Sequence, residues 1–283
     1  MIWGYAGVFP GEFRIWDGDP FRNKYRFLAD HGFAATGIGL KEALHPEKRA
    51  FLRGEAPATG IVHSVHVSMD FFTAPVEALR EQAARLVEGL AEVKEDVRAR
   101  LVVVNAGPYH RYQREPSRGF QMERLREALA PLAAGAHGLG LKTGLENHCD
   151  YLVEDILDLC GAVPHLGLFW DTGNGAMTGD HPSLASRRAA PRTVGTHFKD
   201  FFAFPNEKTL MLELKGASLG EGDMELERLH RDLMELHPDP ESLVMEFELI
   251  PDAALGPWAS LERSKRFVER ISGWKFRYPE ARQ

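Results

Sequence analysis

The chain has 283 residues, of which 44% are hydrophobic and 27% are charged, a balance typical of globular proteins that excludes intrinsic disorder. Asp and Glu number 41 against 34 Lys and Arg, which gives a formal net charge of −7. This acidic balance offers no electrostatic footprint for nucleic acid or for an anionic membrane surface, so neither is expected as a partner.

Short apolar runs alternate with longer amphipathic stretches along the whole chain. The apolar runs predict strands near residues 2–7, 33–39, 61–68, 101–106, 142–147, 166–171, 193–198 and 243–248. The amphipathic stretches predict helices near residues 20–31, 45–53, 76–97, 118–138, 153–161, 181–190, 223–236 and 259–272. The stretch 76–97 is the clearest helix, because Val76, Leu79 and Ala83 begin a series of apolar residues at steps of three and four.

Alternating strands and helices predict the α/β class. Residues 101–104 are apolar on both faces, as expected of a parallel strand between two layers. Eight strand–helix units of about 34 residues each fill the chain, which predicts a single (β/α)8 barrel. A doubly wound open sheet is the alternative, but its glycine fingerprint is missing after the first strand. Since no linker or shift in composition divides the chain, we predict one domain over residues 1–283.

The two cysteines and the apolar runs bear on the cellular compartment. Cys149 and Cys160 are too few for a disulfide framework or a cysteine-rich zinc site. No basic leader precedes the first apolar stretch, and no run of about 18 apolar residues occurs. We therefore expect a cytoplasmic protein that does not span a membrane.

Ionisable side chains come late in four neighbouring strands, where a barrel carries its active site. They are Glu146 within residues 141–148, Asp171 within 166–174, His197 within 194–200 and Glu246 within 243–248. A single strand-end carboxylate is usually solvated or caps the next helix. Three carboxylates at one barrel mouth would repel each other unless a cation lay between them. Mixed oxygen and imidazole ligands suit Mn²⁺, Mg²⁺, Co²⁺ or Zn²⁺, so the pattern predicts a divalent-metal site.

Five motifs carry a resemblance to a known family. In chain order they are GLENH, GLFWDTGNG, GTHFKD, the turn at residues 220–223 and VMEFE. Together they resemble the xylose isomerase-like TIM barrel superfamily, and more narrowly its sugar phosphate isomerase/epimerase group, which includes ketose 3-epimerases and inosose isomerases and dehydratases. The resemblance implies a TIM barrel with Glu146, Asp171, His197 and Glu246 as metal ligands. It also implies that Glu146 and Glu246 act as the acid/base pair and that the protein forms a homo-oligomer.

Proton transfer beside a carbonyl is the chemistry that such residues would perform. A metal on the carbonyl and hydroxyl oxygens stabilises an enediolate, while one carboxylate removes a proton and a second group returns it. We predict an isomerase or epimerase of a small keto-sugar, inosose or related polyol, with Mn²⁺ as the first choice of metal. A metal-dependent lyase of the inosose dehydratase kind is the alternative, and a non-catalytic sugar-binding barrel is a third.

Two departures from the family pattern narrow the function. Many members have a histidine where this chain has Asn174, three residues after Asp171. The endonuclease IV branch, which cuts DNA with three metals, has a histidine at the end of the fourth strand, where this chain reads Val104-Asn105. The missing histidines and the acidic charge argue against DNA repair.

The remaining candidates are side chains that would contact a sugar. We expect His66, Asn174, Lys199 and Trp16 to bind substrate. Each has a simpler reading: Lys199 pairs with Asp171 or Glu248, and Trp16, like Phe9, packs within its own loop. His63 has the opposite parity to His66 and is expected to face the helix layer. The apolar run 201–205 is expected to be exposed, as a lid or a dimer contact. Glu248 shares a face with Glu246, and the family match favours Glu246 as the ligand.

Overall fold

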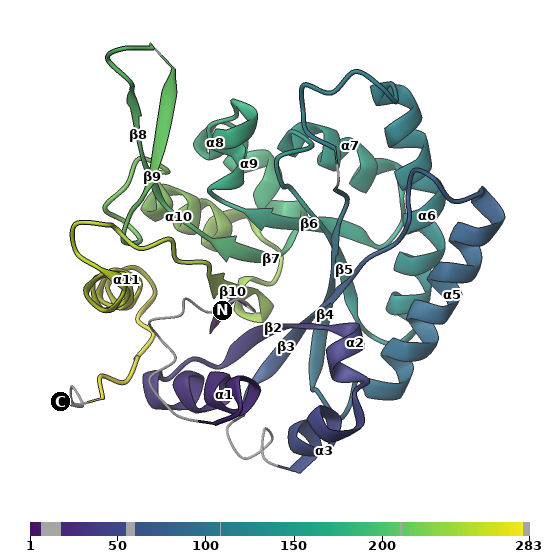
Figure 1. Ribbon diagram of the computed structural model, residues 1–283, viewed down its shortest axis with the longest axis horizontal. Helices are drawn as coiled ribbons and strands as arrows, with labels where there is room; N and C mark the ends of the chain where they lie inside the picture. The colour runs from purple at the N-terminus through teal and green to yellow at the C-terminus, as the bar shows by residue number, and fades with distance from the viewer. Residues whose placement is uncertain (7–17, 55–59, 108, 210, 280–283) are drawn as a thin grey trace.

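The computed structural model describes residues 1–6, 18–54, 60–107, 109–209 and 211–279. Eight strands, all paired in parallel, close into a barrel in the order β1–β10–β7–β6–β5–β4–β3–β2 (Figure 1). They are β1 (Ile2–Tyr5), β2 (Ala35–Gly39), β3 (Val62–Val67), β4 (Ala99–Asn105), β5 (Lys142–Glu146), β6 (Leu166–Asp171), β7 (Thr193–Phe198) and β10 (Val244–Phe247). Each lies within two residues of its predicted bounds, and the predicted (β/α)8 TIM barrel is confirmed.

Helices cover the outside of the barrel (Figure 1). The longer ones are α1 (Pro20–His31), α3 (Pro46–Gly54), α5 (Val76–Val93), α6 (Arg118–Gly138), α7 (Val153–Ala162), α9 (Pro182–Ala189), α10 (Leu226–Leu236) and α11 (Pro257–Ser272). In the described ranges, the short helices α2 (Leu40–Ala43) and α8 (Asn174–Thr178) follow β2 and β6, and η2 (Ala190–Arg192) and η3 (Pro240–Ser242) are 3-10 turns. Among the described residues, no helix is both long and apolar enough to cross a bilayer.

Local sequence signals account for the ends of α1. The Asp19 side chain accepts a hydrogen bond from the Phe21 amide at 2.9 Å, and Pro20 occupies the first turn, where its missing N–H costs nothing. Gly32 ends the helix in the left-handed region at φ 75°. These signals orient α1 so that the face containing Tyr25 and Leu28 is buried against the barrel.

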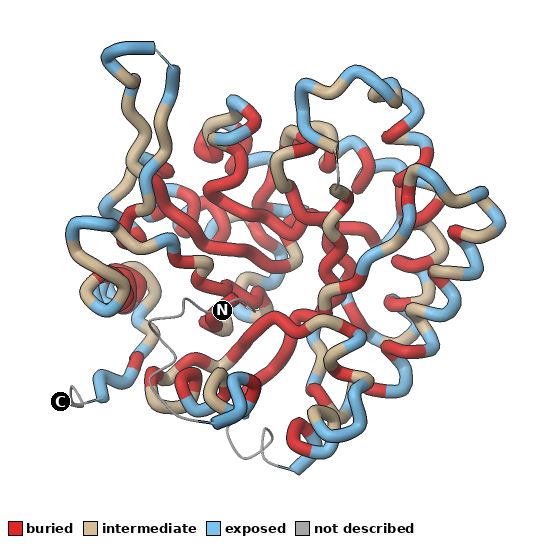
Figure 2. The backbone as a smooth tube through the Cα atoms, viewed as in Figure 1, coloured by how far each residue is buried: buried red, intermediate tan, exposed pale blue. Residues whose placement is uncertain are grey.

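Two apolar layers explain why the strands are apolar on both faces. Figure 2 shows the strands almost wholly buried, whereas the outer sides of the helices are exposed. A small cluster fills the barrel interior: Ala35, Val62, Leu101, Val103, Phe169 and Val244. A much larger cluster lies between strands and helices. The interior needs glycine at position 144, since a Cβ there would come 2.7 Å from Val194 Cγ2 and 2.8 Å from Phe169 Cβ.

A two-stranded hairpin interrupts the strand–helix alternation after β7. Its strands, β8 (Phe201–Pro205) and β9 (Leu212–Gly216), are antiparallel and project from the barrel at the upper left of Figure 1. The sequence predicted an exposed segment here. That prediction is wrong for Phe201, which is buried because its ring packs closely against Gly173 in the turn after β6, whereas Pro205, Leu212 and Lys215 of the hairpin are exposed.

Candidate metal centre

The ends of β5, β6 and β7 bring Glu146, Asp171 and His197 together. His197 Nδ1 lies 3.0 Å from Glu146 Oε1 and 3.8 Å from Asp171 Oδ2. Glu146 and Asp171 are the last residues of their strands, and Asp171 pairs in register with His197. All three are buried. The parallel register therefore places three of the predicted ligands at one point of the mouth, by which we mean the carboxyl-terminal end of the barrel strands.

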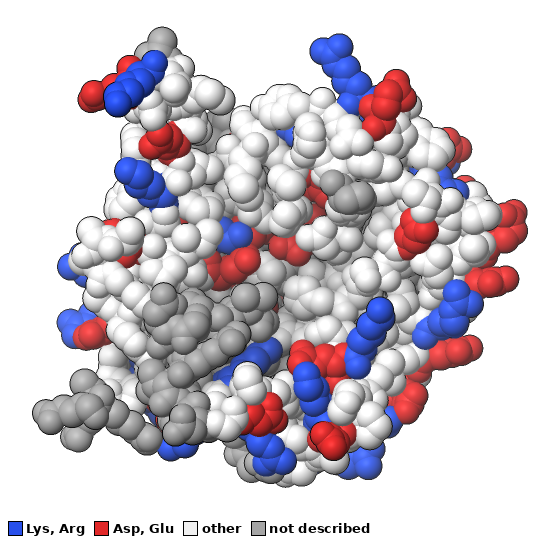
Figure 3. Space-filling view, viewed as in Figure 1, with Lys and Arg blue, Asp and Glu red and all other residues white. Residues whose placement is uncertain are grey.

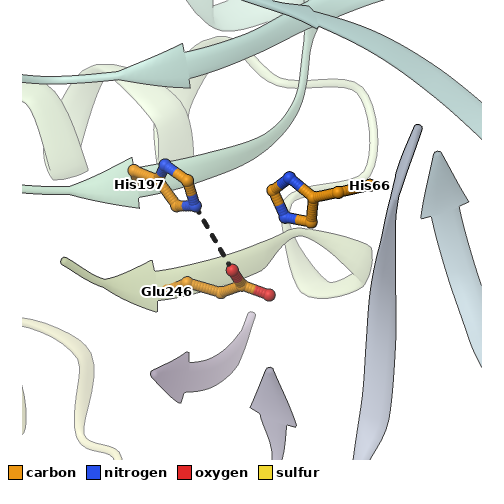
Figure 4. Close-up of side chains that lie close together, drawn as sticks. All are labelled: His66, His197 and Glu246. Atoms are coloured by element: carbon orange, nitrogen blue, oxygen red, sulfur yellow. Dashed lines mark ion pairs between the residues drawn. The ribbon is translucent and has the colours of Figure 1, made fainter. Parts of the chain in front are cut away.

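Glu246 and Glu248 approach His197 from different sides. Glu246 Oε2 lies 3.5 Å from Nε2, and Glu248 Oε2 lies 3.2 Å from Nδ1. Figure 4 shows Glu246 and His66 on the Nε2 side of the imidazole. Two groups of metal-ligating atoms consequently share His197: one also holds Glu146, Asp171 and Glu248, and the other holds His66 and Glu246. The sequence had favoured Glu246 over Glu248, whereas these distances place Glu248 nearer to Glu146 and Asp171.

Lys199 is paired with carboxylates, which the sequence analysis gave as the alternative to substrate binding. Its Nζ lies 2.9 Å from Asp171 Oδ2 and 2.8 Å from Glu248 Oε2. It also donates a hydrogen bond to Asn174 Oδ1 at 3.1 Å. Asn174 is itself buried and donates to the Asn147 carbonyl at 3.2 Å. Both predicted substrate contacts thus already have partners within the protein.

His66 and His63 point in opposite directions, as their parity predicted. The His66 ring lies in the mouth, nearly parallel to His197 with 5.9 Å between ring centroids (Figure 4). The buried His63 ring instead meets the hydroxyl of Tyr25 on α1, 2.8 Å from Nε2. His66 therefore faces the candidate centre and His63 belongs to the helix layer.

The structure does not describe every predicted candidate. Trp16 and Phe9 lie outside the described residues. His148 is half-buried in the loop after β5, where Cys149 Sγ lies 3.3 Å from its Nδ1.

Asn147 and Ser64 support the site, and sequence reasoning missed both. Asn147 clamps β5 to β6, because its side chain donates to the Asp171 carbonyl at 2.9 Å and accepts from the Asp171 amide at 2.8 Å. Ser64 donates to Glu246 Oε1 from across the barrel. The position of Asn147 next to Glu146 in the sequence could have indicated its role. The contact of Ser64 joins residues 182 positions apart, so no local sequence pattern indicates it.

Opposing effects set the charges of the cluster. Burial raises the pKa of Asp171 to about 7, although the Lys199 ammonium counteracts it. Burial lowers the pKa of His197, but Glu146, Glu246 and Glu248 together outweigh burial and raise the pKa well above its ordinary value. For Glu146, burial raises the pKa and His197 brings it below the ordinary value. Positive charge on His197 and Lys199 thus holds the carboxylates together, which is the role a divalent cation fills among clustered carboxylates.

The donor set fits a divalent cation. Buried polar atoms are concentrated here, and Glu246 Oε2, His197 Nε2 and His66 Nε2 lack a hydrogen-bond partner within the described part of the chain. The donors are carboxylate oxygens and imidazole nitrogens without thiolate, a combination typical of Mn²⁺, Mg²⁺, Co²⁺ and Zn²⁺ sites. Figure 3 shows acidic and basic side chains meeting near the centre of the face over the strand ends, apart from the charges at the periphery.

Solved structures that are similar to this chain include the following three proteins. IOLI protein with a bound zinc atom has a TM-score of 0.69 at 16% identity, over 97% of this chain and 99% of that chain. The probable 3-DHS dehydratase AsbF of Bacillus anthracis has a TM-score of 0.67 at 15% identity, over 96% and 100%. The D-psicose 3-epimerase of Clostridium cellulolyticum H10, solved with D-tagatose, has a TM-score of 0.66 at 16% identity, over 96% and 99%. At such identities the likeness is one of fold.

Family membership follows from the sequence itself. No curated protein matches the chain. The profile of the xylose isomerase-like TIM barrel family, however, matches residues 25–255, which span seven of the eight barrel strands. The closed barrel and the strand-end cluster of carboxylates and histidine agree with this match. The chain therefore belongs to the xylose isomerase-like TIM barrel family.

Proposed function

We propose that the protein is a divalent-metal-dependent isomerase or epimerase of a small keto-sugar, inosose or related polyol. The observation that carries the proposal is the approach of two glutamates to opposite nitrogens of one buried histidine. Glu146 lies 3.0 Å from His197 Nδ1, and Glu246 lies 3.5 Å from Nε2. Carboxylates on two sides of one centre are what proton removal and return at a substrate carbon require.

Glu146, Asp171, His197 and Glu246 are the residues that we propose as metal ligands, with Mn²⁺ as the ion. A bound divalent ion would supply Lewis acidity beside the substrate carbonyl. The protein's own residues then have separate tasks. Glu146 and Glu246 hold and move the proton, Lys199 and Asn174 fix Asp171, and His66 lies where it can donate a hydrogen bond to a substrate hydroxyl.

Similar solved barrels support the proposed reaction class. Their names include a D-psicose 3-epimerase and a probable dehydratase, and the IOLI structure carries zinc. Epimerisation and aldose–ketose isomerisation both begin with removal of the proton beside a carbonyl, which forms a carbanion. Loss of a β-hydroxyl from the same carbanion is the reaction of a dehydratase. The test must therefore separate proton exchange from loss of water.

Solvent-deuterium exchange makes that separation. The Mn²⁺-loaded protein is incubated in deuterated water with a panel of keto-sugars and inososes, and products are followed by NMR. We expect deuterium at a carbon beside the carbonyl of recovered substrate or isomer. Formation of an enone or diketone would identify a lyase instead, and metal binding without exchange on any member of the panel would indicate a sugar-binding protein.

Glu146→Gln tests the role of the carboxylate. Loss of the base should slow exchange by about 10²–10⁴-fold, while the remaining ligands keep part of the metal. His197→Ala should mainly weaken metal affinity, because it removes the group that all the carboxylates surround. Glu88→Gln, at an exposed position of α5, is the matched control and should leave both readouts unchanged. Elemental analysis reports the metal, and equal exchange in Glu146→Gln and Glu88→Gln would contradict the assignment.

A further inference from the structure

Lys24 of α1 brings an ammonium group to the backbone of β2. Its Nζ donates a hydrogen bond to the Gly37 carbonyl at 2.6 Å. Gly37 pairs in register with Ser64, whose hydroxyl donates to Glu246. The ammonium therefore lies at the level of the barrel where Glu246 is held, although Lys24 itself belongs to the outer helical layer.

Among the described residues, the inward face of β2 beside this ammonium carries few side chains. Gly37 and Gly39 share the parity of Ala35, which belongs to the interior cluster, so β2 presents no side chain to the mouth beyond Ala35. A Cβ built on Gly39 would meet no atom within 4 Å. Gly39 also pairs in register with His66. Within the described part of the chain, no side chain therefore fills the space between His66 and Gly39.

Lys24 differs from Lys199 in having no counter-charge. Among the described residues, Gly37 O is the one hydrogen-bond acceptor of its Nζ, and no carboxylate lies within 4.0 Å. Glu42, the nearest source of negative charge on α2, is bonded to Lys48. Burial lowers the pKa of Lys24 to about 8, and Glu42 and Glu246 offset this only in part. The group is still a cation at neutral pH, with two of its three donors unused.

We propose that Lys24 is a specificity-determining residue that binds a carboxylate group of the substrate. The inference rests on the proposed function and narrows the substrate to a keto-acid or hydroxy-acid polyol. In the barrel order β2 is directly across from β6, which carries Asp171, so a short chain with its carbonyl at the acidic cluster would place its far end near Lys24.

A carboxylate suits this position better than a phosphate. Four carboxylates already surround the centre, namely Glu146, Asp171, Glu246 and Glu248. A phosphate with a charge of about −1.5 to −2 would add strong repulsion against a single ammonium. Phosphate groups are also usually bound by several N–H donors or by a bidentate arginine. One ammonium matches the single charge of a carboxylate.

Three ligands that differ only at the carbon farthest from the keto group test the inference: D-fructose, D-fructuronate and D-fructose 6-phosphate. Calorimetric titration of the Mn²⁺-loaded protein at neutral pH should show D-fructuronate binding about tenfold more tightly than D-fructose, as for a hydrogen bond to a charged group. Lys24→Met should reduce the preference to within about twofold while leaving D-fructose affinity unchanged. Lys24→Gln, which keeps a donor for Gly37 O without the charge, is the second variant and should behave alike.

Lys41→Met is the matched control, because Lys41 is an exposed lysine of the neighbouring helix α2 and should keep the full preference. A preference for D-fructuronate that survives both Lys24 variants, equal binding of D-fructose and D-fructuronate, tighter binding of the phosphate, or binding of none of the three would overturn the inference. Deuterium exchange separates it from the proposed function. If binding depends on Lys24 but no deuterium exchange occurs, the inference stands and the proposed enzymatic function fails. If exchange occurs without a preference for D-fructuronate, the proposed function stands and the inference fails.

Discussion

At the residue scale, Glu246 in the last strand and Glu248 just after it have different roles in the candidate centre. Glu246 is 0% exposed and held by Ser64, whereas Glu248 is half-buried and paired with Lys199. A ligand needs a fixed position, which the burial of Glu246 and its hydrogen bond from Ser64 provide. This combination favours Glu246, although Glu248 lies nearer to the other carboxylates.

A pair of variants distinguishes them. We expect Glu246→Gln to weaken Mn²⁺ binding by more than about 100-fold, and Glu248→Gln to weaken it by about tenfold, as for a residue that acts through its neighbours. Competition with a fluorescent chelator measures both affinities. The opposite ranking would assign the ligand to Glu248 and leave Glu246 as the orienting partner of His197.

At the element scale, the turn at residues 220–223 is built around a single carboxylate. Asp200 accepts hydrogen bonds from the amides of Gly220, Gly222 and Met224 at 2.8, 3.1 and 3.1 Å. Asp200 directly follows Lys199, so the turn fixes the chain that carries the ammonium at the metal centre. The turn at residues 220–223, one of the five motifs that resemble the family, therefore has a structural role.

Gly222→Ala tests this anchor. A Cβ at this position would run into the Asp200 carboxylate and lie 2.6 Å from the Phe201 carbonyl oxygen. We expect a loss of about 1–3 kcal/mol in the free energy of unfolding, measured with urea. Gly119→Ala on α6 is the control, because its Cβ would face open space, and it should be neutral or slightly stabilising. Equal stabilities of the two variants would show that the turn tolerates displacement.

The hairpin β8–β9 is the element that the sequence did not predict. Its first strand reads as an unbroken apolar run without alternation, so periodicity could not separate a strand from a loop. An isolated two-stranded ribbon is marginal in water and depends on tertiary anchors. Here the anchors are Asp223, whose carboxylate accepts from the Ala203 amide at 2.7 Å, and the packing of Gly216 against Ile250. Neither contact is local in the sequence.

At the scale of the whole molecule, buried histidines make stability depend on pH. Burial lowers the pKa values of His31 and His63 to about 3 and that of His230 to about 4. In the unfolded chain each would titrate near pH 6.5. Between these values the unfolded state binds more protons than the folded state, so stability is present above about pH 6.5 and is lost as the pH falls.

Chemical denaturation at two pH values measures this effect. We expect His63 alone to account for a loss of about 2 kcal/mol in the free energy of unfolding between pH 7 and pH 5. His63→Gln should therefore show a smaller decrease over the same interval, whatever its stability at pH 7. The same decrease in both proteins would mean that the imidazole of His63 takes up its proton without unfolding. His181→Gln serves as the control, since that ring lies at the surface end of α9.

The sequence by itself predicted the barrel, which is confirmed, and the convergence of Glu146, Asp171 and His197 at its mouth. Parallel strands buried on both faces leave an unmistakable alternation of apolar runs and amphipathic stretches, and the strand ends of β5, β6 and β7 must converge once the barrel closes. The tertiary structure alone decided which of Glu246 and Glu248 lies beside Asp171, that Lys199 is already paired, and that Lys24 of α1 contacts the backbone of β2. These facts depend on side-chain direction and on contacts across the ring. Periodicity along the chain specifies the face on which a residue lies, but not its partner on a distant strand.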